Sequence, residues 1–87
     1  MKAILLSKEN EDYTRSSIEF MTEFNKLHPD NRLENIDSNT PEGSRLVSLY
    51  GLNQLPAILI ITNDGQLINL WQGNLPLKDD IFAYLRY

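Results

Sequence analysis

The apolar residues of this chain follow two spacings, and these divide it into seven predicted elements. Short apolar runs bounded by polar or turn residues predict strands. These runs are Ala3 to Leu6, Leu33 to Asp37, Ile58 to Ile61 and Leu67 to Gly73. Longer segments with apolar residues three or four positions apart predict helices. They lie from Tyr13 to Leu27, between Thr40 and Gly51, and from Pro76 to Leu85.

The first two strands differ in how apolar they are. Ala3 to Leu6 is apolar throughout, which is typical of a central strand buried on both faces. The second strand has only Leu33 and Ile36 as apolar residues, so we expect it at an edge of the sheet.

The first two helices carry different boundary signals. In the first, Ile18, Met21 and Phe24, with Phe20 and Leu27, predict one apolar face, and the acidic residues Glu11 and Asp12 would cap its start. The second has stronger signals. Thr40 supplies a capping hydroxyl, Pro41 suits the first helical position, and Gly51 favours a helix end.

The second half of the chain reads as a hairpin followed by a helix. Leu55-Pro56 opens the apolar run of the third strand, and the turn Asn63-Asp64-Gly65 returns the chain along a second edge strand. Pro76 and the acids after Lys78 open the last helix. Its apolar face would comprise Leu77, Ile81, Phe82 and Leu85.

Length and composition limit what this chain can do. Its 87 residues suffice for one domain, 1–87, and a net charge of −4 without a lysine or arginine block argues against nucleic-acid binding. The longest apolar run is about five residues, against roughly 20 for a membrane span. The first residues turn polar too soon for a signal peptide, so we expect a cytoplasmic protein.

The residue types also limit the chemistry. The chain has no cysteine, and its single histidine, His28, stands in a polar loop where we expect it to be exposed. These counts exclude a disulfide framework and a zinc site built from His and Cys. No acidic spacing indicates calcium binding or an acid–base pair, so we expect neither metal nor cofactor.

Several short motifs, taken together, resemble the thioredoxin and glutaredoxin pattern. They occur in the family's order and cover about half the chain. In sequence they are Asn35-Ile36-Asp37, Thr40-Pro41, Tyr50-Gly51-Leu52, Leu55-Pro56-Ala57, Asp64-Gly65 and Gly73-Asn74-Leu75. The resemblance implies an α/β, thioredoxin-like fold of the glutaredoxin type, βαβαββα.

In this fold a four-stranded mixed sheet has the order 2-1-3-4 and helices on both faces. Right-handed crossovers from the first and second strands, with one antiparallel strand from the hairpin, lead to the same order. The resemblance further implies that the Leu55-Pro56 bond is cis and faces the site.

The resemblance also locates the positions of the family's two active-site cysteines. It places Glu11 and Thr14 there, with Tyr13 retained between them. A carboxylate keeps a negative charge but is no nucleophile toward disulfides, so the chain cannot perform thiol–disulfide exchange.

The sequence is compatible with two functions. One is a redox-inactive accessory module that holds a protein or peptide segment in a groove. The groove would comprise Glu11, Asp12, Tyr13, Thr14, Leu55, Pro56, Gly73 and Asn74. The other is a transferase-like enzyme that binds glutathione through a hydroxyl of Tyr13 or Thr14.

Two further alternatives concern the same residues. Each groove residue could instead serve the fold alone. A structural role is also open, in which the chain is a monomer or a weak homodimer through an edge strand, either Leu33 to Asp37 or Leu67 to Trp71.

Overall fold

The computed structural model describes residues 1–86 and contains the seven expected elements in the expected order. The strands are β1 (Lys2–Ser7), β2 (Leu33–Asp37), β3 (Ala57–Ile61) and β4 (Leu67–Gln72). The helices are α1 (Thr14–Leu27), α2 (Pro41–Tyr50) and α3 (Lys78–Leu85).

The strands form one mixed sheet in the order β2-β1-β3-β4, which confirms the predicted topology. β1 and β2 are parallel, whereas β3 runs antiparallel to both of its neighbours. One of the two helical connections therefore differs from the prediction of two crossovers. Only β1-α1-β2 joins parallel strands, so the right-handed crossover rule applies to that unit and not to β2-α2-β3.

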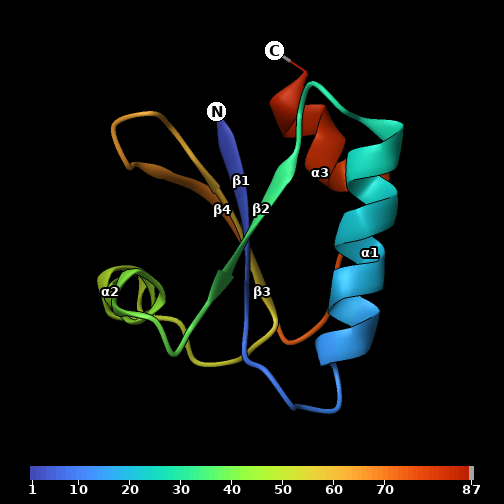
Figure 1. The fold of residues 1–87 in the computed structure, drawn as a ribbon. Helices are drawn as coiled ribbons and strands as arrows, with labels where there is room; N and C mark the ends of the chain where they lie inside the picture. Colours follow the sequence, from blue (N-terminus) through green and yellow to red (C-terminus); the bar gives the residue numbers. More distant parts are fainter. Residues whose placement is uncertain (87) are drawn as a thin grey trace.

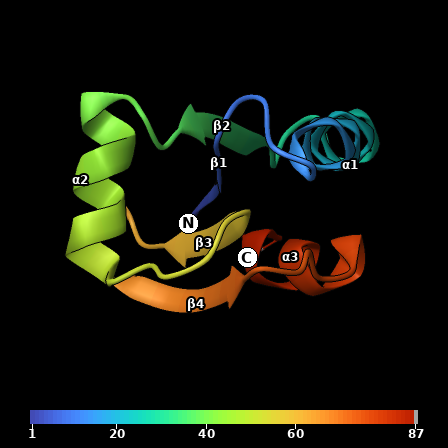
Figure 2. The same cartoon turned by 90° about the horizontal axis from the view of Figure 1, so that it is seen from below.

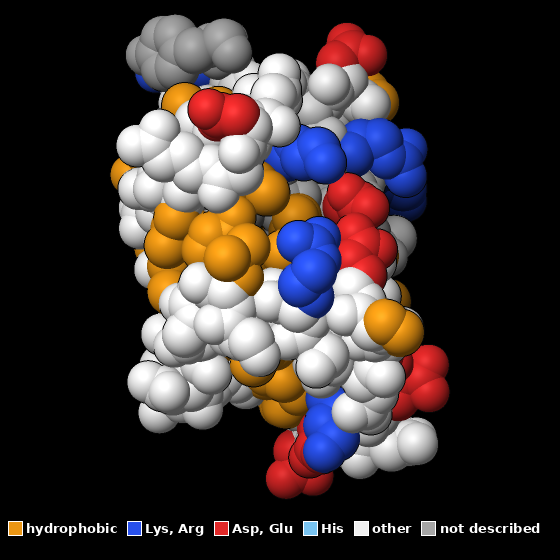
Figure 3. All heavy atoms as spheres, turned by 90° about the vertical axis from the view of Figure 1, so that its left-hand side faces the viewer, with side chains coloured by type: hydrophobic (Ala, Val, Ile, Leu, Met, Phe, Trp, Pro, Cys, Tyr) orange, Lys and Arg blue, Asp and Glu red, His pale blue; other side chains and the backbone are white. Residues whose placement is uncertain are grey.

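The sheet lies between two helical layers, as Figure 1 shows, with α1 and α3 on one face and α2 on the other. Alternation along β1 assigns its side chains to two cores. Ala3 and Leu5 join the cluster that contains Phe24 and Ile81, whereas the intervening side chains join the cluster around Leu46. Of the three helices within residues 1–86, α2 alone covers its face, and Figure 3 shows hydrophobic side chains reaching the surface on that side.

Both ends of α2 form as the sequence predicts. The Thr40 hydroxyl accepts a hydrogen bond from the Gly43 N–H at 3.0 Å, and Gly51 ends the helix with φ of 63°. The structure also shows why Gly43 lies in the first turn. A Cβ there would collide with the Asp37 carbonyl oxygen, so α2 contacts the end of β2 backbone to backbone.

The start of α1 differs from the prediction. The helix begins at Thr14, and its capping residue Tyr13 makes no side-chain capping bond. The expectation that Glu11 and Asp12 cap the helix is therefore wrong. Both acids lie in the turns before the first helical residue, too early to reach its free N–H groups.

The apolar faces of α1 and α3 are also shifted from the predicted ones. Leu27 is 65% exposed and Leu77 is 73% exposed, since they occupy the last position of α1 and the capping position of α3. His28, expected to be exposed, is half-buried and stacks on Phe82 with ring centroids 3.8 Å apart. Its ring covers apolar surface just beyond the end of α1.

None of the helices in the described part of the chain combines the length and apolar character needed to cross a bilayer.

Candidate functional site

The last residues of β1, β2 and β4 and the first residue of β3 lie in one row at the same end of the sheet. Ser7 pairs with Asp37 on β2, and Leu6 pairs with Ala57 on β3, so Ser7 and Pro56 are neighbours by register. Ala57 pairs in turn with Gln72 on β4. Figure 2 looks onto this end, which carries the loops that follow β1, β2 and β4 and the loop that precedes β3.

Pro56 lies buried in this row and is tied to the end of β4. Its carbonyl oxygen accepts a hydrogen bond from the Gly73 N–H at 2.9 Å. The Leu55-Pro56 peptide bond is cis. Gly73 has φ of 82°, a conformation that a residue with a side chain rarely adopts.

Leu55 differs from Pro56 in its backbone. Its side chain is half-buried against the cluster around Leu46, but its N–H and C=O make no hydrogen bond with any described residue. A backbone donor and acceptor left unpaired beside a sheet can bind another extended chain. Asn74, exposed and just beyond Gly73, flanks the same row.

Gln72 holds the loop before Pro56 and was not found from the sequence. Its side-chain oxygen accepts hydrogen bonds from the N–H groups of Asn53 at 2.7 Å and Gln54 at 3.2 Å. The side chain of Gln54 in turn fills the space that a Cβ on Gly73 would need. Sequence reasoning misses Gln72 because its partners are backbone groups 18 or 19 residues away.

Thr14 organises the loop on the other side of Ser7. Its hydroxyl donates to the Lys8 carbonyl oxygen at 2.6 Å and accepts from the Glu11 N–H at 3.1 Å. The Thr14 N–H closes the turn by donating to the Glu11 carbonyl oxygen at 3.2 Å. Both functions of the hydroxyl are therefore used within the loop.

Negative charge surrounds Tyr13. Burial is the largest effect and raises the pKa of its phenol, the Lys8 backbone lowers the pKa by less, and the carboxylates of Glu11 and Asp37 each raise it by a still smaller amount. The ring therefore stays neutral at physiological pH. Glu11 and Asp12 are exposed, and the Glu11 carboxylate lies 3.9 Å from the Lys8 ammonium group.

The predicted site residues thus form two groups at the same end of the sheet. Glu11 to Thr14 are held to Lys8, next to Ser7, by the Thr14 hydroxyl. Leu55 and Pro56 lie just before the start of β3, and Gly73 and Asn74 lie just after the end of β4. Within the described residues no hydrogen bond or ion pair joins one group to the other. The described residues also include no cluster of three or more potential metal ligands.

No protein-family model matches this chain, and no curated protein matches it. Solved structures do match. The chain is similar to thioredoxin 1 from Thermosipho africanus TCF52B, with a TM-score of 0.72, 17% identity, and coverage of 99% of this chain and 96% of the other. A structure described as a malarial protein also has a TM-score of 0.72, with 13% identity over 97% of this chain and 91% of that one.

The C-terminal domain of Neisseria meningitidis DsbD in the reduced form is a third match. Its TM-score is 0.65, with 19% identity over 98% of this chain and 78% of that domain. At these identities the comparisons show a shared thioredoxin-like fold. The chain has that fold without a cysteine, and so without a thiol of its own for disulfide exchange.

Proposed function

We propose that this chain is a redox-inactive, thioredoxin-like accessory module that binds an extended protein or peptide segment beside Pro56. The observation that supports the proposal is the backbone of Leu55, which has no hydrogen-bond partner among residues 1–86 and lies at the end of the sheet where β3 begins and the other strands end. In the family that the chain resembles, the residue before this proline pairs with the extended chain of a substrate. Loss of the cysteines removes the chemistry and leaves this backbone pair intact.

Binding would follow the rules of strand addition. A partner segment would exchange hydrogen bonds with the N–H and C=O of Leu55 and rest its side chains on the half-buried Leu55 and Tyr13. On the β4 side, Gly73 has no side chain, and the Gln54 side chain occupies the space that a Cβ there would need. Asn74 would contact the segment on that side.

The charges at this end favour a particular partner. Glu11 and Asp12 are exposed, and Asp37 lies close enough to act electrostatically on Tyr13. Lys8 is already paired with Glu11. We therefore favour a segment that carries lysine or arginine, because opposite charge steers association and like charge opposes it.

The glutathione-binding alternative has less support. The Thr14 hydroxyl already donates to Lys8, so Tyr13 is left to stabilise a thiolate, and the nearby carboxylates would oppose that anion. We expect no saturable chemical-shift change at Glu11 to Thr14 with millimolar glutathione. Saturation in the micromolar range would favour the enzyme instead.

Selection from a random displayed-peptide library, followed by affinity measurement on the purified chain, tests the proposal. We expect basic, extended peptides whose affinity falls about fivefold or more in Asn74→Lys, because a cation is then placed beside a cationic ligand. The matched control is Asn63→Lys, an exposed asparagine in the hairpin turn at the other end of the sheet, which should bind like the parent. Equal affinity of all three proteins, or failure to select any peptide, would overturn the proposal.

A further inference from the structure

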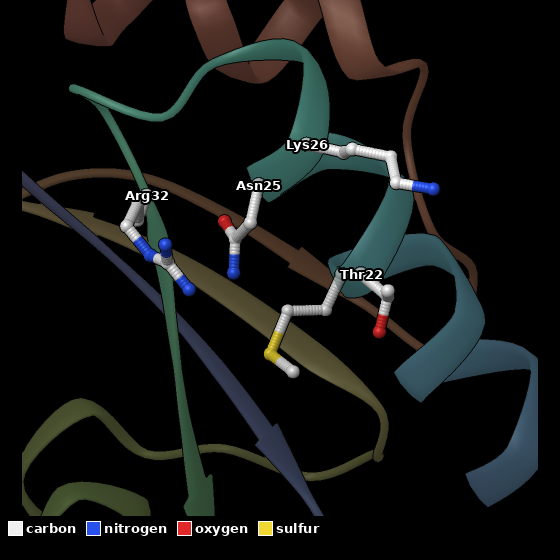
Figure 4. Close-up of a pocket in the computed structure, with 5 residues that line it drawn as sticks. Thr22, Asn25, Lys26 and Arg32 are labelled. Carbon is white, nitrogen blue, oxygen red and sulfur yellow. The ribbon is translucent and has the colours of Figure 1, made fainter.

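A hollow lies beside α1, away from the row of strand ends. It has a volume of about 280 Å³ and is lined by residues of the second half of α1 and of the segment just before β2. Figure 4 shows these residues, which are Met21, Thr22, Asn25, Lys26 and Arg32. The proposed peptide groove uses none of them.

The two segments that line the hollow are joined by the buried side chain of Asn25. The amide of Asn25 donates to the Leu33 carbonyl oxygen at 3.1 Å and accepts from the Leu33 N–H at 2.7 Å. These two bonds fasten α1 to the start of β2 and fix the backbone on which Lys26 and Arg32 are carried. The hollow is therefore part of the fold rather than a gap between loose segments.

Two cations on this hollow lack an anionic partner. Lys8, Arg15 and Lys78 each pair with a glutamate, whereas neither Lys26 nor Arg32 lies within 4.0 Å of a carboxylate of the described residues. Figure 4 shows the Arg32 side chain directed toward Asn25, with Lys26 extending on the far side of Asn25. The Lys26 ammonium group thus points away from Arg32, so in a chain of net charge −4 the unpaired Arg32 provides the nearer positive charge for an anion in the hollow, with Lys26 at its rim.

The other lining groups indicate what kind of anion fits. The hydroxyl of Thr22 donates to the Ile18 carbonyl oxygen, and the Asn25 amide uses its oxygen and one N–H on Leu33. The guanidinium of Arg32, with several N–H groups in a planar fork, therefore offers the most donors on the hollow. Met21 is half-buried and contributes an apolar surface beside that donor.

We propose that this hollow binds a small organic anion, with a carboxylate on Arg32 and an apolar body on Met21. A carboxylate matches the planar fork of a guanidinium. The volume is slightly below the 300–1,000 Å³ typical of pockets for drug-sized ligands, which limits the ligand to a small molecule.

Titration of the isotope-labelled chain with benzoate, inorganic phosphate and benzamide tests this assignment. We expect saturable shifts of the Met21 methyl and Arg32 side-chain signals with benzoate, at a dissociation constant of about 1 mM, since both cations are exposed to water. Benzamide lacks the charge and phosphate lacks the apolar body, so each should bind at least about tenfold more weakly.

Variants provide the control. Arg32→Gln should weaken benzoate binding about tenfold or more, the effect of losing a hydrogen bond to a charged group. Lys26→Gln should weaken it less, and Arg45→Gln, on the exposed side of α2, should not change it. Absence of saturation, equal affinity for benzoate and phosphate, or an Arg32→Gln variant that binds like the parent would overturn the proposal.

Discussion

Ser17 is the buried polar residue whose presence the core does not explain. Its side chain is fully buried on α1, and its hydroxyl has no hydrogen-bond partner among the described residues. The carbonyl oxygen four residues earlier, on Tyr13, already accepts from the Ser17 N–H and from the Ser16 hydroxyl. A buried hydroxyl in this position reduces stability, because it has lost its water without gaining a protein partner.

Ser17→Ala should therefore raise the free energy of unfolding by about 1 kcal/mol, through removal of the unpaired hydroxyl and the higher helix propensity of alanine. The control is Ser16→Ala, which removes an exposed hydroxyl that does have a partner and should have little effect. Urea unfolding of the three proteins measures both values. A Ser17→Ala protein less stable than the parent would show that the hydroxyl has a role the fold does not reveal.

Cysteines introduced at Glu11 and Thr14 would test whether these are the positions of the family's two active-site cysteines. A hydrogen bond from Thr14 N–H to Glu11 C=O joins them across one turn, so their Cα atoms lie within the roughly 7 Å of a β-turn, in reach of a disulfide. The double variant Glu11→Cys/Thr14→Cys should fold and form an internal disulfide when a low-molecular-weight disulfide oxidises it. It should reduce a small disulfide substrate in the presence of a regenerating thiol.

The thiol at position 11 should be only weakly acidified. Position 11 precedes the capping residue Tyr13, outside the first turn of α1 where the helix field is strongest. Glu11→Ser/Thr14→Ser provides the inert control, and mass spectrometry after alkylation counts the free thiols. A folded double-cysteine variant that stays fully reduced under the same oxidant would exclude these positions as the active-site equivalents.

At the scale of elements, local signals in the sequence located the ends of α2 but not its packing. Thr40 and Gly51 act on their own helix, so their residue types alone indicate the ends. Gly43 is required by the Asp37 carbonyl on a different element, which no local pattern can show. The structural roles of Asn25 and Gln72 could not be predicted from the sequence either, because their hydrogen-bond partners are backbone groups on other segments.

Gly43→Ala should lower the free energy of unfolding by about 2 kcal/mol or more, although alanine is the better helix former. The new methyl group would meet the backbone of Asp37 and Ser38, which cannot move without separating α2 from β2. The neighbouring exposed Ser44→Ala serves as the control and should be neutral or slightly stabilising. Thermal unfolding of both variants decides the matter, and a Gly43→Ala protein as stable as Ser44→Ala would contradict the packing described here.

The sequence predicts more of this fold than of its candidate site. Apolar runs identify β1 and β3 because both are buried on two faces, and the sparse Leu33 and Ile36 identify an edge strand. The predicted apolar faces of the helices were wrong at Leu27 and Leu77, which lie at helix ends and are exposed. For the site, the sequence indicated Leu55, Pro56 and Gly73, while the lack of a hydrogen-bond partner for the Leu55 backbone among the described residues is visible only in three dimensions.

At the scale of the whole molecule, asparagine side chains occupy backbone groups at both edges of the sheet. On β2, Asn25 bonds to the N–H and C=O of Leu33. On β4, the N–H of Gly73 points toward β3, since it donates to the Pro56 carbonyl oxygen. Successive N–H groups of a strand point to opposite sides, so the N–H of Leu70, three residues earlier, points away from β3. It donates to the side-chain oxygen of Asn69 at 2.7 Å. These bonds occupy part of each edge and so disfavour pairing between copies there, and we expect a monomer.

Asn69→Ala should free the outward N–H of Leu70 and promote self-association, seen as a concentration-dependent rise in the weight-average mass by sedimentation equilibrium. Asn69 also donates to the Tyr84 hydroxyl, so Tyr84→Phe is the matched control that removes this second bond and leaves the edge occupied. It should remain monomeric like the parent. A dimeric parent, or equal association of the two variants, would contradict the protective role of Asn69.

The most direct test of the account is amide hydrogen exchange at Leu55, measured by NMR on the free chain and on its complex with a selected basic peptide. In the free chain the Leu55 N–H has no partner among the described residues and should exchange rapidly. In the complex it should become protected and show intermolecular NOEs to the backbone of the peptide. A peptide that binds while Leu55 exchanges as fast as before, without NOEs to this residue, would contradict the assignment of this end of the sheet as the binding site.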